Sequence, residues 1–180
     1  MAILKQTGGG QIRAYDIDNV CPEGNYSARC IDLMESMGVE EEEYGKPGSF
    51  VTKDKCRFLF AVKAEDGTVH MVQSREFNIS GSPKSNIVGF IRGWLGKTPP
   101  PAFDTLNLVN EVAQISISQR TSPKGTVYAA VETIAPLMDA SKAPAIGEIE
   151  VPGGARAAVQ VDTTVTADSS SEAGKAADPF

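Results

Sequence analysis

Alternating apolar and polar residues predict strands over much of the chain. Side chains of a strand point to opposite faces in turn, so a repeat of two marks a strand with one buried face. The Asp66-Gly67 pair predicts a hairpin between two of these segments, because Asp-Gly favours the backbone conformation of a tight turn. On this pattern we expect five strands, at residues 26–34, 56–64, 69–79, 112–120 and 126–134.

The spacing of apolar residues becomes helical between the third and fourth predicted strands. Ile87, Ile91 and Trp94 recur at intervals of three and four, which predicts a helix with Trp94 in the core. Ser82 is the expected N-cap, and Pro83 is the expected first helical residue. A glycine and three prolines after residue 95 predict the end of this helix.

The order of three strands, one helix and two strands predicts a mainly β fold. It resembles the OB-fold, a five-stranded Greek-key barrel that commonly binds oligonucleotides over its second and third strands. We assign residues 25–138 to this OB-like domain. Residues 1–24 contain a run of three glycines and are expected to form a flexible arm. Residues 139–180 are poor in large apolar side chains, so we expect them to form a disordered acidic tail.

Charge is distributed unevenly along the 180 residues, whose net charge is −6. Residues 139–180 carry seven acidic and three basic side chains, a net charge of −4, whereas residues 44–97 carry nine basic and four acidic ones, a net charge of +5. Such an asymmetry is typical of proteins that interact with nucleic acid. We hypothesise that the acidic tail lies against the basic region when nucleic acid is absent, through an attraction that salt would screen.

The candidate chemistry argues against an enzyme and against a metal site. The chain has one histidine, His70, and no nucleophile motif. Cys21, Cys30 and Cys56 lack the spacing of a zinc site or a redox pair, so we expect reduced, buried thiols and no cofactor. The four consecutive glutamates at residues 40–43 are expected to form a solvated loop, because adjacent carboxylates do not by themselves converge on an ion.

The location of the protein is predicted from what the sequence lacks. No apolar run approaches the roughly 18 residues of a membrane span. The first six residues also lack the apolar stretch of a signal peptide. We therefore expect a cytoplasmic protein that does not interact with a membrane.

The chain ends in Asp178-Pro179-Phe180. These residues are similar to the C-terminal tip of bacterial and phage single-stranded-DNA-binding proteins, in which a disordered linker joins an OB domain to an acidic tip ending in Pro-Phe. This chain departs from that pattern at residues 175–177, where Lys-Ala-Ala stands in place of acids and an isoleucine. The resemblance implies non-specific binding of single-stranded DNA in DNA replication, recombination or repair, in the bacterial host cytoplasm if the protein is phage-encoded. It also implies that the tip recruits replication and recombination proteins.

Single strands are bound by basic grooves that follow the phosphates and by aromatic rings on which bases stack. The alternation places several basic and aromatic side chains on the solvent-facing side of the predicted sheet or at its turns. Phe77 and Tyr128 are the expected stacking residues, whereas Phe58 and Phe60 are expected in the core. The candidate nucleic-acid-binding residues are Arg29, Lys55, Arg57, Lys63, Arg75, Phe77, Arg120, Lys124 and Tyr128.

A second interpretation is an OB-like module that binds protein, for example a phage factor that binds or blocks a host protein. The fold supports it equally well, because a fold does not dictate a function. Edge strands of such a barrel also invite pairing with another copy, so a homo-oligomer is compatible with the sequence.

Overall fold

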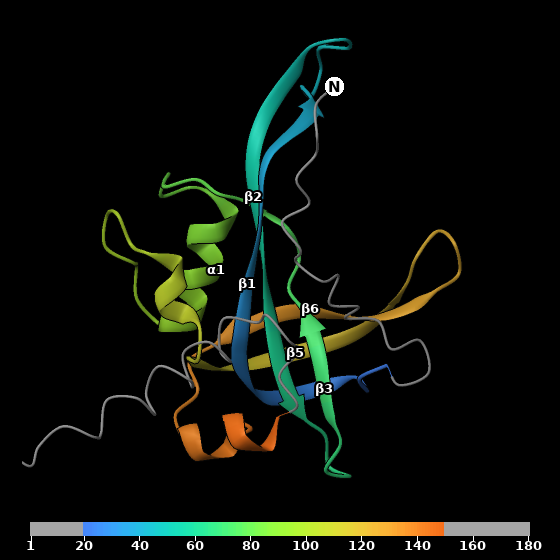
Figure 1. The fold of residues 1–180 in the computed structure, drawn as a ribbon, viewed down its shortest axis with the longest axis vertical. Helices are drawn as coiled ribbons and strands as arrows, with labels where there is room; N and C mark the ends of the chain where they lie inside the picture. The colour runs from blue at the N-terminus through green and yellow to red at the C-terminus, as the bar shows by residue number, and fades with distance from the viewer. Residues whose placement is uncertain (1–19, 150–180) are drawn as a thin grey trace, which may run out of the picture.

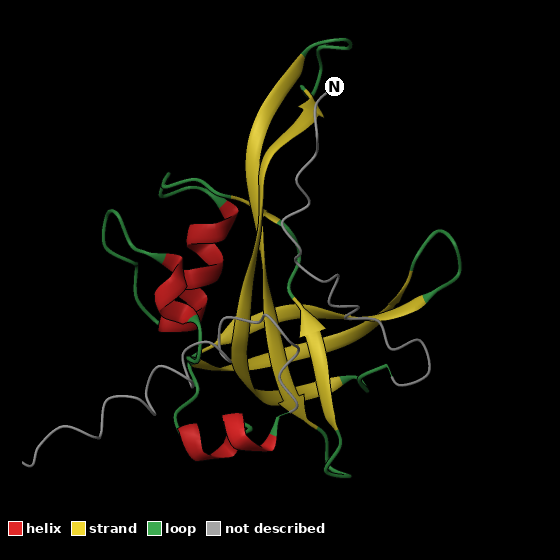
Figure 2. Cartoon of the chain, viewed as in Figure 1, coloured by secondary structure: helices red, strands yellow, loops and turns green. Residues whose placement is uncertain are grey.

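The computed structural model describes residues 20–149, which form one antiparallel sheet, one α-helix and three short 3-10 helices (Figures 1 and 2). This confirms the mainly β fold with a single helix. Along the chain the elements are β1 (Gly24–Glu42), β2 (Phe50–Lys63), β3 (Val69–Gln73), β4 (Phe77–Asn78), α1 (Asn86–Leu95), η1 (Thr105–Leu108), β5 (Val112–Thr121), β6 (Val127–Ala135), η2 (Ala140–Lys142) and η3 (Ile146–Glu148).

The strand order is β3-β2-β1-β5-β6, and the short β4 also pairs with β2. β3 and β6 are the two ends of this path and lie near each other, but no ladder of hydrogen bonds joins them in the described residues. The sheet is therefore not closed into a barrel, which differs from the five-stranded Greek-key barrel that the strand order predicts. β3 is only five residues long, and the chain then returns to β2 as β4, so it offers β6 little edge to pair with.

β1 and β2 are much longer than predicted. The first part of β1 pairs with β5, and the rest pairs with β2 as far as Glu42 opposite Phe50. Residues 35–55 project from the body as a two-stranded hairpin, which we call the arm (Figure 1). Glu40, Glu41 and Glu42 lie in β1, so the loop predicted for the four glutamates was wrong for all but Glu43. Alternation did not indicate this part of the strands because both faces of the arm are largely in solvent.

The core lies between α1 and the face of β2 that carries Phe58 and Phe60, and both of these residues are buried as predicted. Trp94 packs against both rings and donates an indole hydrogen bond to the carbonyl of Val112, 2.9 Å away. The helix begins later than expected: Ser85, not Ser82, is the N-cap, and its hydroxyl accepts from the amide of Val88. Among the described residues, no helix is long and apolar enough to cross a membrane.

The third predicted strand is broken, and this reverses the orientation of Phe77. Gln73 pairs with Leu59, but Phe77 pairs with Cys56, so one extra residue is inserted between β3 and β4. Ser74 stabilises the break, because its hydroxyl accepts from the amide of Phe58 and donates to the carbonyl of Arg75. A slip of one residue moves a side chain to the other face of a sheet.

Phe77 is 1% exposed and packs against Phe58 and Phe90 in the core, so its predicted role as an exposed stacking residue was wrong.

The described chain continues past the expected domain boundary at residue 138. Residues 139–149 contain η2 and η3, and Pro144 and Ile149 are buried against the body. Arg29 holds this segment in place, because its guanidinium donates to the carbonyls of Pro144 and Asn110, each at 2.7 Å. Residues 1–19 of the predicted flexible N-terminal segment and residues 150–180 of the predicted tail lie outside the described residues.

Candidate functional site

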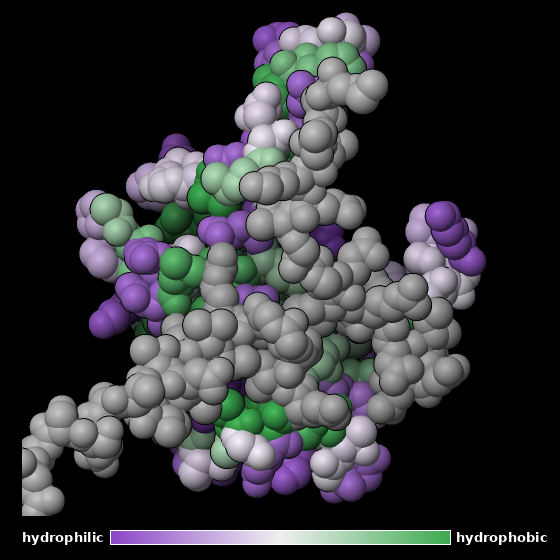
Figure 3. All heavy atoms as spheres, in the orientation of Figure 1, coloured by the Kyte–Doolittle hydropathy of each residue, from purple (hydrophilic) through white to green (hydrophobic). Residues whose placement is uncertain are grey.

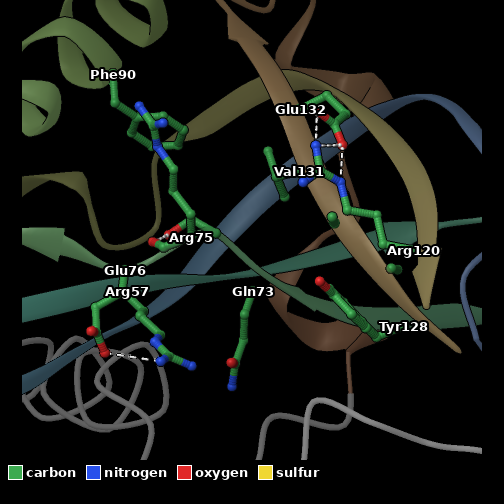
Figure 4. A pocket seen from close by; sticks show the side chains of 12 residues that line it. Arg57, Gln73, Arg75, Glu76, Phe90, Arg120, Tyr128, Val131 and Glu132 are labelled. Atoms are coloured by element: carbon green, nitrogen blue, oxygen red, sulfur yellow. Dashed lines mark hydrogen bonds and ion pairs between the residues drawn. The ribbon is translucent and has the colours of Figure 1, made fainter. Parts of the chain in front are cut away.

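An open hollow of about 430 Å³ lies where the two ends of the strand path approach each other (Figure 4). We call it the groove. One wall comes from β2 and the residues after β3, and the other comes from β5 and β6. The groove is lined by Arg57, Gln73, Ser74, Arg75, Glu76, Phe90, Arg120, Tyr128, Ala129, Ala130, Val131 and Glu132.

The first wall carries a chain of ion pairs that runs from the groove into the arm. Glu76 accepts from Arg57 Nη2 and from Lys55 Nζ, both at 2.9 Å. Lys55 also contacts Glu41 of the arm, and Glu41 accepts from Lys53 Nζ at 3.2 Å. The hydrogen bond from Lys55, followed by that from Arg57, holds the pKa of Glu76 below its ordinary value, although burial opposes the shift. Glu76 therefore stays ionised and orients Arg57 toward the groove.

Arg75 is the least neutralised cation of the groove. It lies in the break between β3 and β4, is exposed, and forms no ion pair with another described residue. Its guanidinium carbon lies 5.0 Å from the centre of the Phe77 ring, which is within the range of a cation–π contact. The ring positions the guanidinium without cancelling its charge, so Arg75 is available to an anionic ligand.

The opposite wall holds Arg120 through a bidentate ion pair. Arg120 Nε and Nη2 donate to the two carboxylate oxygens of Glu132, each at 2.8 Å. The carboxylate also accepts from Ser118, and this bond, followed by that from Arg120, lowers the pKa of Glu132. Glu132 is the extra residue of a β-bulge, because Ser116 pairs with Thr133 whereas Ile117 pairs with Val131.

Aromatic surface accompanies these charges. Tyr128 is opposite Arg120 in the β5–β6 ladder and is partly exposed. Phe90 of α1 contributes a second partly exposed ring. Three arginines and two glutamates leave the groove with one net positive charge. The groove thus combines planar cations, aromatic rings and one amide, Gln73, in a space that is open to solvent.

The structure brings together four of the predicted site residues, Arg57, Arg75, Arg120 and Tyr128 (Figure 4). The signal that found them was alternation along the strands, together with residue type. Sequence reasoning missed the polar and aromatic partners. Gln73 and Phe90 are not among the predicted site residues, and the pairing of Glu76 and Glu132 with the arginines needs the tertiary fold.

The other five predicted residues do not line the groove. Phe77 lies in the core, and Lys55 is only 11% exposed because it is held between two glutamates. Arg29 and Lys63 serve the C-terminal segment: Arg29 binds the Pro144 carbonyl, and Lys63 Nζ lies 4.0 Å from the carboxylate of Glu148.

Lys124 is exposed in the turn between β5 and β6. The tip residues Asp178, Pro179 and Phe180 lie outside the described part of the chain.

No redox or metal chemistry is indicated by the described residues. Cys21, Cys30 and Cys56 are free and buried, as predicted. Burial raises the pKa of all three thiols, to about 11 for Cys21 and Cys56, so they are protonated and poorly nucleophilic near neutral pH. No group of three or more His, Cys, Asp or Glu side chains within residues 20–149 is arranged to hold a metal ion.

Comparisons of this chain with protein-family models, with curated proteins and with solved structures found no match. The groove and the order of the strands are therefore the features that bear on function.

Proposed function

We propose that this chain binds single-stranded nucleic acid, without sequence preference, in the groove between β2–β3 and β5–β6. The observation that carries the proposal is the convergence of Arg57, Arg75, Arg120 and Tyr128. They come from opposite ends of the strand path and meet in one open space. A single strand exposes both phosphates and the faces of its bases, and this set of side chains offers a partner to each.

Arginine suits this task because its planar guanidinium can donate two parallel hydrogen bonds to a phosphate. In the unbound groove, Glu76 and Glu132 occupy two of the three guanidiniums. Arg75 has no such carboxylate among the described residues and makes the first contact with a phosphate. The phosphates then share or replace the carboxylates at Arg57 and Arg120, while a base stacks on Tyr128 at a gain of about 1–3 kcal/mol.

The strand order supports an OB-like assignment. Four strands precede the helix, of which the two-residue β4 lies off the main path, and two strands follow it; β1 lies at the centre of the path, between β2 and β5. OB-folds bind oligonucleotides over strands two and three and with the loops that join strands one to two and four to five. The groove borders β2 and β3 here, and the β5–β6 hairpin corresponds to the last of these loops.

The proposal extends to DNA replication, recombination or repair through the resemblance of Asp178-Pro179-Phe180 to the partner-binding tip of single-stranded-DNA-binding proteins. In that setting the groove covers the strand and the tip recruits the replication or recombination machinery. A cytoplasmic location, in a bacterial host if the protein is phage-encoded, belongs to the same proposal.

The direct test is fluorescence anisotropy of a labelled oligo-dT at several salt concentrations, with a duplex of equal length as the competitor. We expect the single strand to bind more tightly, with a salt slope of about −0.7 per phosphate contacted. Arg75→Ala should weaken binding about tenfold, since one charge-assisted contact to phosphate is worth roughly 1.5–3 kcal/mol. Arg92→Ala is the matched control, because Arg92 is an exposed arginine of α1 that does not line the groove.

Equal effects of these two variants would show that binding is a general response to surface charge and would remove the groove from the proposal. Absence of binding at low salt, with folding verified by circular dichroism, would overturn the function itself.

An OB-like module that binds protein is the second candidate. One observation favours it: the arm exposes large apolar side chains, among them Met37, Tyr44 and Phe50, that the nucleic-acid proposal does not use. A chain of this kind would ignore oligonucleotide in the same titration.

A further inference from the structure

The arm has two chemically different faces. Lys53 and Lys55 both contact Glu41, so these three side chains lie on one face, which we call the basic face of the arm. Alternate residues point to the opposite face. There Phe50 pairs with Glu42 and Thr52 pairs with Glu40, so carboxylates surround an aromatic ring on what we call the acidic face.

Large apolar side chains are exposed on or beside the acidic face. Phe50 is 66% exposed, and Met37, in the irregular stretch of β1 opposite Asp54, is 68% exposed. The strand positions of this face, residues 40, 42, 50, 52 and 54, hold three carboxylates and no basic side chain. In the space-filling view the end of the arm shows hydrophobic and hydrophilic residues side by side (Figure 3). Exposed apolar groups rimmed by polar residues are typical of interaction sites.

The same chain contains a surface complementary to this face. The groove offers three arginines, the Phe90 and Tyr128 rings and the apolar Val131 side chain. We propose that the acidic face of the arm docks into the groove of a second copy, with Phe50 inserted between its two walls. Glu40 and Glu42 then approach the arginines of that groove, and Arg75 is the guanidinium most available to them.

The contact has to be between copies, because the arm cannot present this face to its own groove. Lys55 links Glu41 of the arm to Glu76 of the groove wall, which fixes the basic face of the arm on the side of its own groove. The acidic face points the opposite way. Each copy therefore offers one arm and one groove, and two copies satisfy both by a reciprocal exchange about a two-fold axis.

Docking of the arm goes beyond nucleic-acid binding and does not depend on it, because it follows from the side chains of the arm and of the groove alone. It has a consequence for that function, because a groove that holds an arm cannot also hold a strand. Oligonucleotide and the second copy then compete for the same site. By linkage, each lowers the apparent affinity of the other.

Sedimentation equilibrium of the full chain over a wide range of concentrations provides the test. We expect a monomer–dimer equilibrium that weakens as salt increases, since charge attraction contributes. Phe50→Ser should raise the dimer dissociation constant by about a hundredfold or more, because each dimer loses two aromatic side chains that are each worth about tenfold or more at the centre of an interface. Met138→Ser is the control, because Met138 is also a large, exposed apolar side chain but lies in neither the arm nor the groove.

A mixing experiment identifies the two surfaces. Phe50→Ser keeps an intact groove, and Arg75→Glu keeps an intact arm. Each variant alone should remain monomeric, whereas an equimolar mixture should form a heterodimer through the one intact arm and the one intact groove. A wild-type chain that stays monomeric at every concentration would overturn the proposal, and so would an unchanged dimer dissociation constant in Phe50→Ser or variants that fail to complement each other.

The outcome is separable from that of the proposed function. Dimers that dissociate when oligo-dT is added support both proposals. Dimers in a chain that binds no oligonucleotide leave the exchange of arms standing and overturn only the nucleic-acid proposal. Oligonucleotide binding by a chain that never dimerises supports the nucleic-acid proposal and overturns the docking of the arm.

Discussion

The two halves of β2 lie in opposite environments. Residues 58–62 are buried without interruption, with α1 packed on the face that carries Phe58 and Phe60. Residues 50–55 belong to the arm, where side chains meet solvent and Lys53 and Lys55 are paired with carboxylates. One strand thus passes from a region held by apolar burial to one held by its backbone ladder and ion pairs.

The residues that stabilise the fold and the residues proposed to bind ligands lie in different parts of this chain. Fully buried aromatic side chains contribute several kcal/mol each, whereas exposed ion pairs contribute about 0–1 kcal/mol. The body can therefore hold the groove walls rigidly while the arm remains tolerant of substitution. The residues proposed to bind ligands lie at the boundary and in the arm, where changing a side chain costs the fold little.

The sharpest test of this comparison replaces the same residue type in each half. Phe58→Ala should lower the free energy of unfolding by about 3–5 kcal/mol, because it leaves a cavity among the rings of Phe77, Phe90 and Trp94. Phe50→Ala in dilute protein should change it by less than about 0.5 kcal/mol. Urea unfolding measures both, and equal losses would mean that the arm is part of the cooperative core.

A smaller effect is expected where the body holds the C-terminal segment. Arg29→Ala removes two charge-assisted hydrogen bonds to the carbonyls of Pro144 and Asn110 and should cost about 2–3 kcal/mol. Hydrogen exchange should speed up selectively in residues 139–149. Arg29→Lys should restore the loss only in part, because an ammonium cannot span the two carbonyls as a guanidinium does. Unchanged exchange in that segment would show that Arg29 does not hold it.

In the groove, removing a carboxylate should strengthen ligand binding. Glu132→Gln removes the carboxylate that neutralises Arg120. The groove then presents one more uncompensated positive charge to a phosphate. We expect the affinity for oligo-dT to rise about three- to tenfold, because a negative charge that repels the phosphate is removed. Anisotropy titration at fixed salt measures it, and Glu148→Gln, outside the groove, is the control. A loss of affinity would mean that Glu132 positions Arg120 for binding.

The smallest expected effect is on the stability of the fold at acidic pH. Both Glu76 and Glu132 have a pKa below the ordinary value of 4.5, so their ion pairs add stability above that value. This contribution disappears as the pH falls from about 4.5 through the lowered pKa of the folded state. The urea midpoint should decrease over this range less steeply in the Glu76→Gln, Glu132→Gln double variant than in the wild type. Identical slopes would show that these carboxylates gain nothing from their partners.

How far the fold could be predicted depended on whether a segment has one buried face. The β5–β6 hairpin and α1 alternate or repeat clearly, and both were located to within a few residues. The arm has no buried face, so its strands carry no such signal, and its consecutive glutamates predict a loop instead. The segment at residues 139–149 was assigned to the tail because its small residues suggest disorder, yet Ala143, Pro144 and Ile149 are buried on a surface that other elements provide.

The amino-acid sequence by itself determined the mainly β character, the single helix and the face of each regular strand, because these depend on local periodicity. It also supplied the arginines and the tyrosine of the groove. The tertiary structure alone decided which of them meet. Phe77 left the predicted site through one inserted residue, Lys55 was enclosed by two glutamates, and Arg29 was engaged by a segment over a hundred positions later in the chain. Such contacts depend on distances through space, which the order of residues along the chain does not specify.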